Sequence, residues 1–292
     1  MSNWVIGVIG GSGLYEIDGL ENAEPVSLTT PWGDPSDTLI KGHVGAVEFV
    51  FLPRHGKGHR LTPTTVPYRA NIDALKRLGC TDILSISACG SLQEQYAPGE
   101  FVMVDQFIDR TIARDKTFFG PGMVAHVSVA DPVCGRLSQL AGDAAASAGA
   151  KVHRGGTYLA MEGPQFSSRA ESHMYRAWGC DVIGMTNMPE AKLAREAELP
   201  YATMAMVTDY DCWRADAAAV EVTNVLEVMA ANTAKAKAAI GQLAATLQDT
   251  PRTPSPQGIE TCLDYALITA PDARDPGILA KLDAVAGRVL SA

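Results

Sequence analysis

Short apolar runs that alternate with helical stretches constrain the fold of this chain more than any other feature. The runs are rich in Val and Ile and are punctuated by Gly, which is typical of buried strands. They cover residues 5–9, 47–52, 83–87, 101–104, 157–161, 181–185 and 201–207. Helical patterns lie between several of them, at residues 68–78, 132–148, 168–178, 189–197 and 217–247. Strands that alternate with helices in this way predict a mainly parallel sheet covered by helices.

The end of the chain differs in character from the part before it. Residues 248–260 are polar and proline-rich, which indicates a linker or an exposed crossing segment. Residues 261–292 follow with an apolar run at 266–268 and a pattern for one amphipathic helix over 276–290. We therefore expect an α/β domain over 1–247 and a C-terminal strand and helix extension, which packs on the same domain or on a neighbouring subunit.

Composition excludes several classes of protein. The 292 residues include 24 Lys+Arg and 33 Asp+Glu. The resulting net charge of -9 argues against non-specific binding of nucleic acid. No apolar stretch approaches the roughly 18 residues that span a bilayer, and no signal peptide is recognisable, so we expect a cytoplasmic protein that does not bind membranes. The six cysteines lack zinc spacing and predict free thiols.

Groups that suit an anion follow several of the predicted strands. Ser12 lies in the glycine-dense turn after the first strand, and Arg54 and His55 follow the second. Ser87 and Thr186 stand at the ends of two later strands. Because the carboxyl ends of parallel strands form the ligand edge of an open sheet, we expect these groups to hold a phosphate. A dinucleotide site, and with it an oxidoreductase, is the weaker alternative because Glu16 stands where a third glycine is needed.

Two acids, Asp209 and Asp211, follow the strand at 201–207. Two carboxyl groups held close and partly buried cannot both ionise cheaply, so one pKa should rise and that acid can donate a proton near neutral pH. A divalent metal is the competing interpretation. This stretch supplies too few oxygen ligands for Mg²⁺ or Ca²⁺, so we expect no metal.

In this order, the motifs resemble the family 2 purine nucleoside phosphorylases, over roughly residues 4–269. The long family signature can be followed through Leu52, Gly56, His59, Leu61, Val66, Ala70, Ile72, Ala74, Gly79, Ile83, Leu84, Ser87, Ala88, Gly90, Ser91 and Leu92. The resemblance implies one domain with a mixed central sheet flanked by helices. It also implies phosphate ligands at Ser12, Arg54, His55, Ser87, Ala88 and Thr186. The substrate contacts that it implies are Phe166, Ser167, Ile183, Met185, Val222, Val225, Leu226, His126 and Ile268.

The expected reaction is phosphorolysis of 5'-methylthioadenosine to adenine and 5-methylthioribose 1-phosphate. Asp209 and Asp211 complement a 6-aminopurine, because one can donate to N7 while the other accepts from N6. The implied 5' pocket of Val222, Val225 and Leu226 is apolar and favours a methylthio group over a hydroxyl. Asn187 departs from the small or hydroxyl residue of many relatives, and a preference for methylthioinosine or another 6-oxopurine nucleoside is the alternative.

The resemblance further implies a homotrimer with active sites at subunit interfaces, in which a neighbour contributes His126 and Ile268. Inorganic phosphate is then a co-substrate, and no organic cofactor is expected. A regulator that binds adenosine without turnover could retain the same base pocket, but it would have no use for the phosphate ligands.

Overall fold

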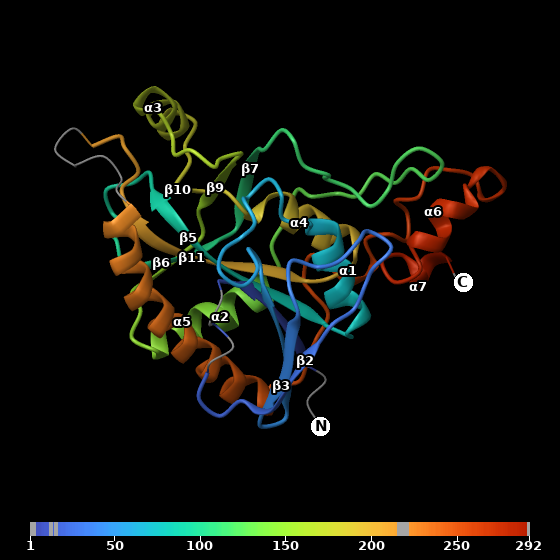
Figure 1. Ribbon diagram of the computed structural model, residues 1–292, viewed down its shortest axis with the longest axis horizontal. Helices are drawn as coiled ribbons and strands as arrows, with labels where there is room; N and C mark the ends of the chain where they lie inside the picture. The colour runs from blue at the N-terminus through green and yellow to red at the C-terminus, as the bar shows by residue number, and fades with distance from the viewer. Residues whose placement is uncertain (1–3, 12–13, 15–16, 215–221, 291–292) are drawn as a thin grey trace.

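The computed structural model describes residues 4–11, 14, 17–214 and 222–290, and for residues 222–225 it describes the backbone only. A single mixed sheet runs through the molecule (Figure 1). Its strands are β1 (Val5–Gly10), β2 (Glu21–Val26), β3 (Leu39–Val44), β4 (Val47–Pro53), β5 (Asp82–Ser91), β6 (Phe101–Val104), β7 (Gln106–Arg110), β8 (Val152–Arg154), β9 (Thr157–Met161), β10 (Val182–Gly184) and β11 (Tyr201–Asp209).

The strands follow the order β2-β3-β4-β1-β5-β10-β9-β7. The central strand β5 pairs in parallel with β1 and β11, and its last residues pair antiparallel with β10. Away from that path, β6 joins β11 to β8. The end of β5 therefore lies between the end of β11 and the start of β10, and the chain after β10 runs back alongside β5 as far as Ser87, to which Asn187 is hydrogen-bonded.

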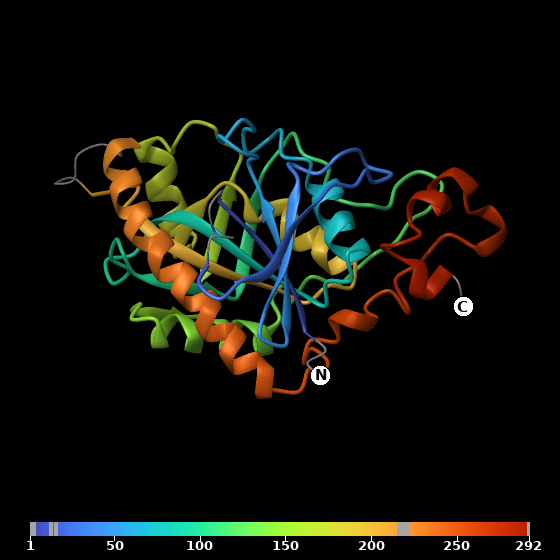
Figure 2. The same ribbon diagram turned by 60° about the horizontal axis from the view of Figure 1, so that its bottom comes forward.

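Helices cover both faces of the sheet (Figures 1 and 2). Helices α2 (Gly135–Ser147) and α5 (Val222–Asp249) pack together on one face, and α1 (Tyr68–Arg77) and α4 (Asn187–Glu196) on the other. The side chains of strand β4 alternate between the two hydrophobic cores, one on each face of the sheet. Phe49 and Phe51 join the core beneath α2 and α5, whereas Val50 and Leu52 join the core beneath α1 and α4. Because both faces are covered, such strands are apolar along their whole length.

A shorter helix, α3 (Arg169–Ala177), starts at the predicted cap. Ser168 accepts from the backbone N–H of Glu171, and the Glu171 carboxylate accepts from the N–H of Ser168, a capping box. The five helices predicted between residues 68 and 247 correspond to α1–α5, and their described ends lie within a few residues of the expected ones.

Strands β2, β3, β7 and β8 were not predicted. Strand β2 is an edge strand whose sequence, ENAEPV, is almost fully exposed and includes a proline. Strand β7 lies at the other edge and is only partly buried. Edge strands bury little, so they leave no apolar run in the sequence.

The helix expected over 276–290 was wrong. The chain forms two short helices, α6 (Pro276–Lys281) and α7 (Gly287–Leu290), with turns between them. Leu282, Val285 and Ala286 lie in this break and are fully buried in the core beneath α1 and α4. A continuous helix would carry its apolar stripe on one side only, whereas the break lets all three side chains turn inward.

Ionic hydrogen bonds attach the proline-rich segment, residues 248–260, to the domain. Helix α5 continues to Asp249, and Arg252 then donates to Asp82 Oδ2 at 2.6 Å and to Glu260 Oε1 at 3.0 Å. In the run 266–268, Leu267 forms a single bridge with Ala125 and no longer strand. All six cysteines are free thiols, as predicted. Within the described residues, none of the helices has the length and apolar character needed to cross a membrane.

Candidate active site

Gly90 lies at the centre of the region where β5, β10 and β11 meet. It pairs with Ile183 of β10 on one side and with Asp209 of β11 on the other. A Cβ atom placed on Gly90 would lie 2.8 Å from Asp209 Oδ1, 3.2 Å from Ile183 Cγ2 and 3.4 Å from Asp211 Cβ. The structure thus brings Ile183 and both predicted acids together, and glycine is required where they converge.

The two acids differ in their hydrogen bonds. Asp209 accepts from the Thr208 hydroxyl at 2.7 Å and from the backbone N–H of Asp211 at 2.8 Å. Burial raises the pKa of Asp209 in spite of these bonds. Burial also raises the pKa of Asp211, and the nearby Asp209 charge adds to the effect. Asp211 Oδ2 is buried and has no hydrogen bond of good geometry among the described residues, although the hydroxyls of Ser172 and Ser167 lie near enough to favour its charged form.

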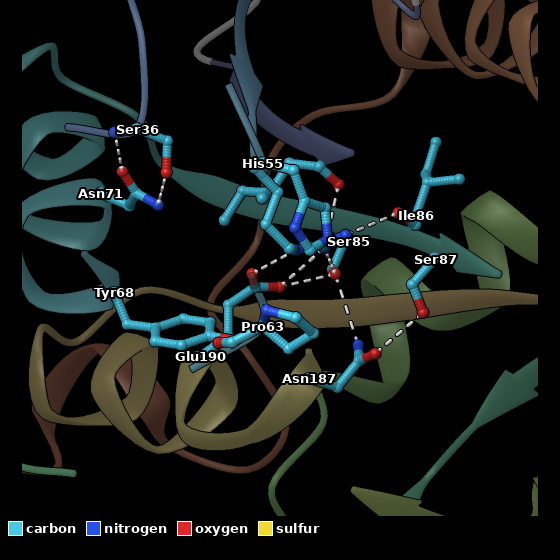
Figure 3. Close-up of polar contacts among 12 residues, drawn as sticks. Ser36, His55, Pro63, Tyr68, Asn71, Ser85, Ile86, Ser87, Asn187 and Glu190 are labelled. Carbon is cyan, nitrogen blue, oxygen red and sulfur yellow. Dashed lines mark hydrogen bonds and ion pairs between the residues drawn. The ribbon is translucent and has the colours of Figure 1, made fainter. Parts of the chain in front are cut away.

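Ser87 and Thr186 lie next to this acidic pair along the strands. Ser87 and Ala88 are opposite Ala205 and Met206 in the β5–β11 ladder. Thr186 follows β10 as the N-cap of α4, and it is 6% exposed. The next residue, Asn187, accepts from the Ser87 hydroxyl at 2.9 Å, which joins the two predicted anion groups (Figure 3).

Arg54 lies deep beneath these hydroxyls. Its side chain is 3% exposed and pairs with Glu190, with Nε donating to Oε2 at 2.8 Å and Nη2 to Oε1 at 3.1 Å. Nη2 also donates to Ser85 Oγ at 2.6 Å. Among the described residues, Nη1 donates to the carbonyl of Ile86 at 3.1 Å, and a guanidinium Nη1 carries a second hydrogen that can serve an anion.

His55 is held as a neutral ring. Its Nδ1 lies 2.9 Å from the carbonyl of Leu61, which can only accept, so Nδ1 carries the proton and Nε2 is an acceptor. Burial lowers the pKa of His55 to about 4, and the positive charge of Arg54 contributes. The ring stacks on His59, with centroids 4.2 Å apart.

The loop after β9 reaches Met185, one of the predicted substrate contacts, and the turn that carries the two acids. A Cβ on Gly163 would lie 2.5 Å from Met185 Sδ, so this loop and the end of β10 touch. Cys212 Sγ donates to the carbonyl of Ser167 at 3.2 Å, which ties the loop to the acidic turn. Phe166, the predicted cover of the base, is 48% exposed.

Six predicted residues lie apart from this cluster, or outside the described side chains. Ser12 falls outside the described residues, and the side chains of Val222 and Val225 are not described. Leu226 of α5 is 53% exposed. Ile268 is 61% exposed, and the chain around it pairs with the segment of His126. This C-terminal region lies at the opposite end of the molecule from α3 (Figures 1 and 2), so His126 and Ile268 do not join the Gly90 cluster within one chain.

Sequence reasoning missed two charged residues that organise the site. Glu190 is the ion-pair partner of Arg54, and no pattern in the sequence pointed to this pairing. Arg114 is 8% exposed and donates to the carbonyls of Met185, Met188 and Glu162, at 2.5, 2.7 and 2.7 Å. It therefore clamps the two loops together. A lone arginine far from any predicted strand end gave no signal.

Two surface cavities, of about 420 Å³ and 540 Å³, lie beside Tyr68 and Arg114 and beside Arg154, respectively. None of the predicted site residues lines either one. In the described part of the chain, no three His, Cys, Asp or Glu side chains gather as a metal site. The candidate site is thus defined by its converging side chains.

A mixed α/β sheet with hydroxyls, a buried arginine and paired acids at its strand ends defines an α/β protein with a polar ligand site at that edge. A family model described as the phosphorylase superfamily matches residues 5–245, and the chain belongs to this family. The resemblance that the motifs predicted is thereby confirmed, as is the mixed α/β fold.

Within this family, the chain is similar to several individual proteins over nearly its whole length. An S-methyl-5'-thioadenosine phosphorylase of Cereibacter sphaeroides is 62% identical over 286 residues, 98% of each chain. One of Bradyrhizobium diazoefficiens is 57% identical over 99% of each chain. Among solved structures, a methylthioadenosine phosphorylase from an antarctic soil metagenomic library has a TM-score of 0.90 at 47% identity, covering 97% of this chain and 99% of that one. A Schistosoma mansoni methylthioadenosine phosphorylase in complex with adenine has a TM-score of 0.82 at 40% identity, with coverage of 88% and 95%.

Proposed function

We propose that this protein catalyses the phosphorolysis of S-methyl-5'-thioadenosine to adenine and 5-methylthioribose 1-phosphate. The observation that carries the proposal is the buried pair Asp209 and Asp211 around Gly90. A protonated carboxyl that donates to N7 and a carboxylate that accepts from N6 complement adenine. The names of the full-length relatives support the same substrate.

In the proposed reaction a phosphate oxygen bonds to C1' while the bond from C1' to N9 breaks. The electron pair of that bond passes into the purine, and Asp209 gives its proton to N7, so adenine leaves as a neutral base. The raised pKa of Asp209 keeps the acid form available. Phosphate faces Ser87, the Ala88 amide, Thr186, His55 and the second hydrogen of Arg54 Nη1, and its charge stabilises the cationic sugar.

The remaining site residues have supporting roles in this proposal. Met185 lies against the ribose, and Ile183 and Phe166 enclose the base. Leu226, with Val222 and Val225, receives the methylthio group. Ser12 adds a phosphate donor. Phosphate is the co-substrate, and the chemistry needs neither a metal nor an organic cofactor.

We further propose a homotrimer in which each site borrows His126 and Ile268 from a neighbour. Both belong to the exposed region far from α3, and Leu226 and Phe166 are also exposed in a single chain. A neighbouring subunit would cover both sets of apolar surface, which is the usual reason for such exposure.

The test is chromatographic. Purified protein is incubated with methylthioadenosine, with and without phosphate, and free adenine is quantified beside parallel reactions with methylthioinosine and adenosine. We expect adenine from methylthioadenosine only when phosphate is present. Adenine without phosphate would indicate a hydrolase and overturn the phosphate site. Hypoxanthine from methylthioinosine alone would overturn the assignment of Asp209 and Asp211 to adenine.

A further inference from the structure

A chain of buried hydrogen bonds with a fixed direction runs beneath the proposed phosphate site. It begins at Glu190, which is 1% exposed and is paired with Arg54. A carboxylate can only accept hydrogen bonds. Glu190 Oε1 lies 2.6 Å from Ser85 Oγ and 2.9 Å from the Tyr201 hydroxyl. Both hydroxyls must therefore use their single hydrogen on Glu190.

This use of their hydrogens leaves Ser85 and Tyr201 as acceptors on their other sides. The amide of Asn187, which is fully buried, lies 2.8 Å from the Tyr201 oxygen and 3.3 Å from Ser85 Oγ. Only its Nδ2 can donate to them. Its two hydrogens serve Tyr201 and Thr203 Oγ1, the latter at 2.7 Å, and the longer contact to Ser85 shares one of them. The orientation of the amide thus follows from the hydrogen bonds.

With Nδ2 turned toward Tyr201, Asn187 Oδ1 faces Ser87 at 2.9 Å (Figure 3). A carbonyl oxygen cannot donate, so the Ser87 hydroxyl must give its hydrogen to Asn187. The hydrogen of Ser87 then points into the protein. The buried Tyr158 hydroxyl lies close enough to Ser87 to take one of its lone pairs, and the other remains for a ligand. A hydroxyl that is free to rotate could donate to an anion, but this one can only accept.

We propose that Asn187 is a positioning residue that makes Ser87 a hydrogen-bond acceptor toward the tetrahedral anion, so that the site selects an anion that still carries a proton. The proposal rests on the proposed function, because it takes Ser87 as a phosphate contact. Hydrogen phosphate can donate its hydroxyl to Ser87. Sulfate is nearly the same size but has no proton near neutral pH, so its oxygen would meet a lone pair instead.

The experiment measures the ratio of the sulfate inhibition constant, competitive with phosphate, to the KM for phosphate at about pH 8, where sulfate carries no proton. Wild-type protein is compared with Asn187→Ser, whose shorter side chain releases the Ser87 hydrogen. We expect the ratio to fall about tenfold or more in the variant, the usual effect of removing one unmatched buried polar contact. Sulfate binding, measured by calorimetry without nucleoside, should tighten in parallel.

The control is Thr203→Val, which removes one bond from Nδ2 but leaves the bond from Ser87 to Asn187 in place. Its ratio should stay within about twofold of wild type, although its stability can fall. Ser87→Ala provides a second variant if Asn187→Ser does not fold, and its ratio should also drop because the acceptor is gone.

An unchanged ratio in both Asn187→Ser and Ser87→Ala would overturn the inference, as would an equal change in Thr203→Val. These outcomes are distinct from a failure of the proposed function, which would appear as wild-type protein that releases no adenine or releases it without phosphate. General damage to the site would weaken phosphate and sulfate together and leave their ratio at the wild-type value, which also counts against the inference.

Discussion

Asp209 combines two properties that a proton donor needs. Its carboxyl is held in place by Thr208 and by the backbone of Asp211, so it can face a bound base without searching for its orientation. Burial raises its pKa, which keeps more of the acid form at a given pH. A raised pKa means that the proton is present at low pH and is lost as the pH rises through that value.

The substitution Asp209→Asn should therefore remove the donor without removing the side chain. We expect kcat on methylthioadenosine to fall about a hundredfold to ten-thousandfold, the range of general acid catalysis. Wild-type kcat at saturating phosphate should decrease as the pH rises, and this decrease should be absent from the residual activity of the variant. Rates measured across the pH range check both points. Asp143→Asn, on an exposed residue of α2, is the matched control and should behave as wild type; full activity in Asp209→Asn would contradict the assignment.

At the level of residues, the sequence predicted the groups that would contact a ligand better than it predicted the residues that hold those groups in place. The acids and Thr186 could be found because they lie at or just after the ends of strands. Ser87 was also found, but its predicted place at a strand end was wrong, because β5 continues to Ser91. Glu190 and Arg114 could not be found this way. Their importance depends on which carbonyls and charges lie within hydrogen-bond distance in three dimensions, and no spacing in the sequence encodes that.

Helix α4 ends on a carboxyl that is unfavourably placed when charged. Glu196 is its last residue, where a negative charge opposes the helix dipole. The carboxyl accepts from Thr117 Oγ1 and from the backbone N–H of Phe118, both at 2.7 Å, and none of its described contacts is a positively charged group. Burial raises the pKa of Glu196 to about 7.

This raised pKa predicts a pH-dependent stability. An unfolded glutamate has a pKa of about 4.3, so the folded state holds the proton more tightly. The favourable contribution is complete below about pH 4 and is lost as the pH rises through 7. Relative to wild type, Glu196→Gln should gain about 1–3 kcal/mol between about pH 5 and 8, because glutamine carries no charge, its oxygen can still accept from the Phe118 N–H, and its amide can donate to Thr117 Oγ1 instead. Urea unfolding of the two proteins at both pH values measures the difference; a difference that does not grow with pH would contradict it.

Among the elements, predictability followed burial. The apolar strands at the centre of the sheet and the amphipathic helices were found because two covered faces demand apolar residues. The hairpin strands β2 and β3 were missed since β2 buries almost nothing. The broken helix after Pro276 was missed for the opposite reason: Leu282, Val285 and Ala286 fit a helical period, but their packing in the core decided the conformation.

The whole molecule places its proposed site residues at two distant ends. Asp209 lies near α3, whereas His126 belongs to the region of the C-terminal extension (Figure 1). One chain cannot bring them together without rearrangement, but a ring of identical chains can, because each copy offers one end to its neighbour. This arrangement makes the proposed trimer testable by function as well as by size.

Mixed assembly provides the test. If each site uses Asp209 from one chain and His126 from the next, chains with Asp209→Asn and chains with His126→Ala are each impaired alone. When the two are dissociated, mixed and reassembled, some interfaces combine the intact Asp209 of one chain with the intact His126 of the other. We expect activity to rise severalfold above the mean of the separate variants, and light scattering to give the mass of a trimer. No gain in a mixture shown to contain hybrid trimers would contradict shared sites.

The directed hydrogen bonds beneath Ser87 also limit how this sequence can change over generations. The direction of each hydrogen bond in this series is fixed by the bond before it. Replacing Glu190 or Tyr201 alone would therefore reverse or break the hydrogen bonds further along the series. Neutral drift at one of these positions therefore depends on the state of the others, and their substitutions should arise in compensating pairs. In a large set of relatives, positions 85, 187, 190 and 201 should covary as one group, while the exposed residues of β2 vary independently.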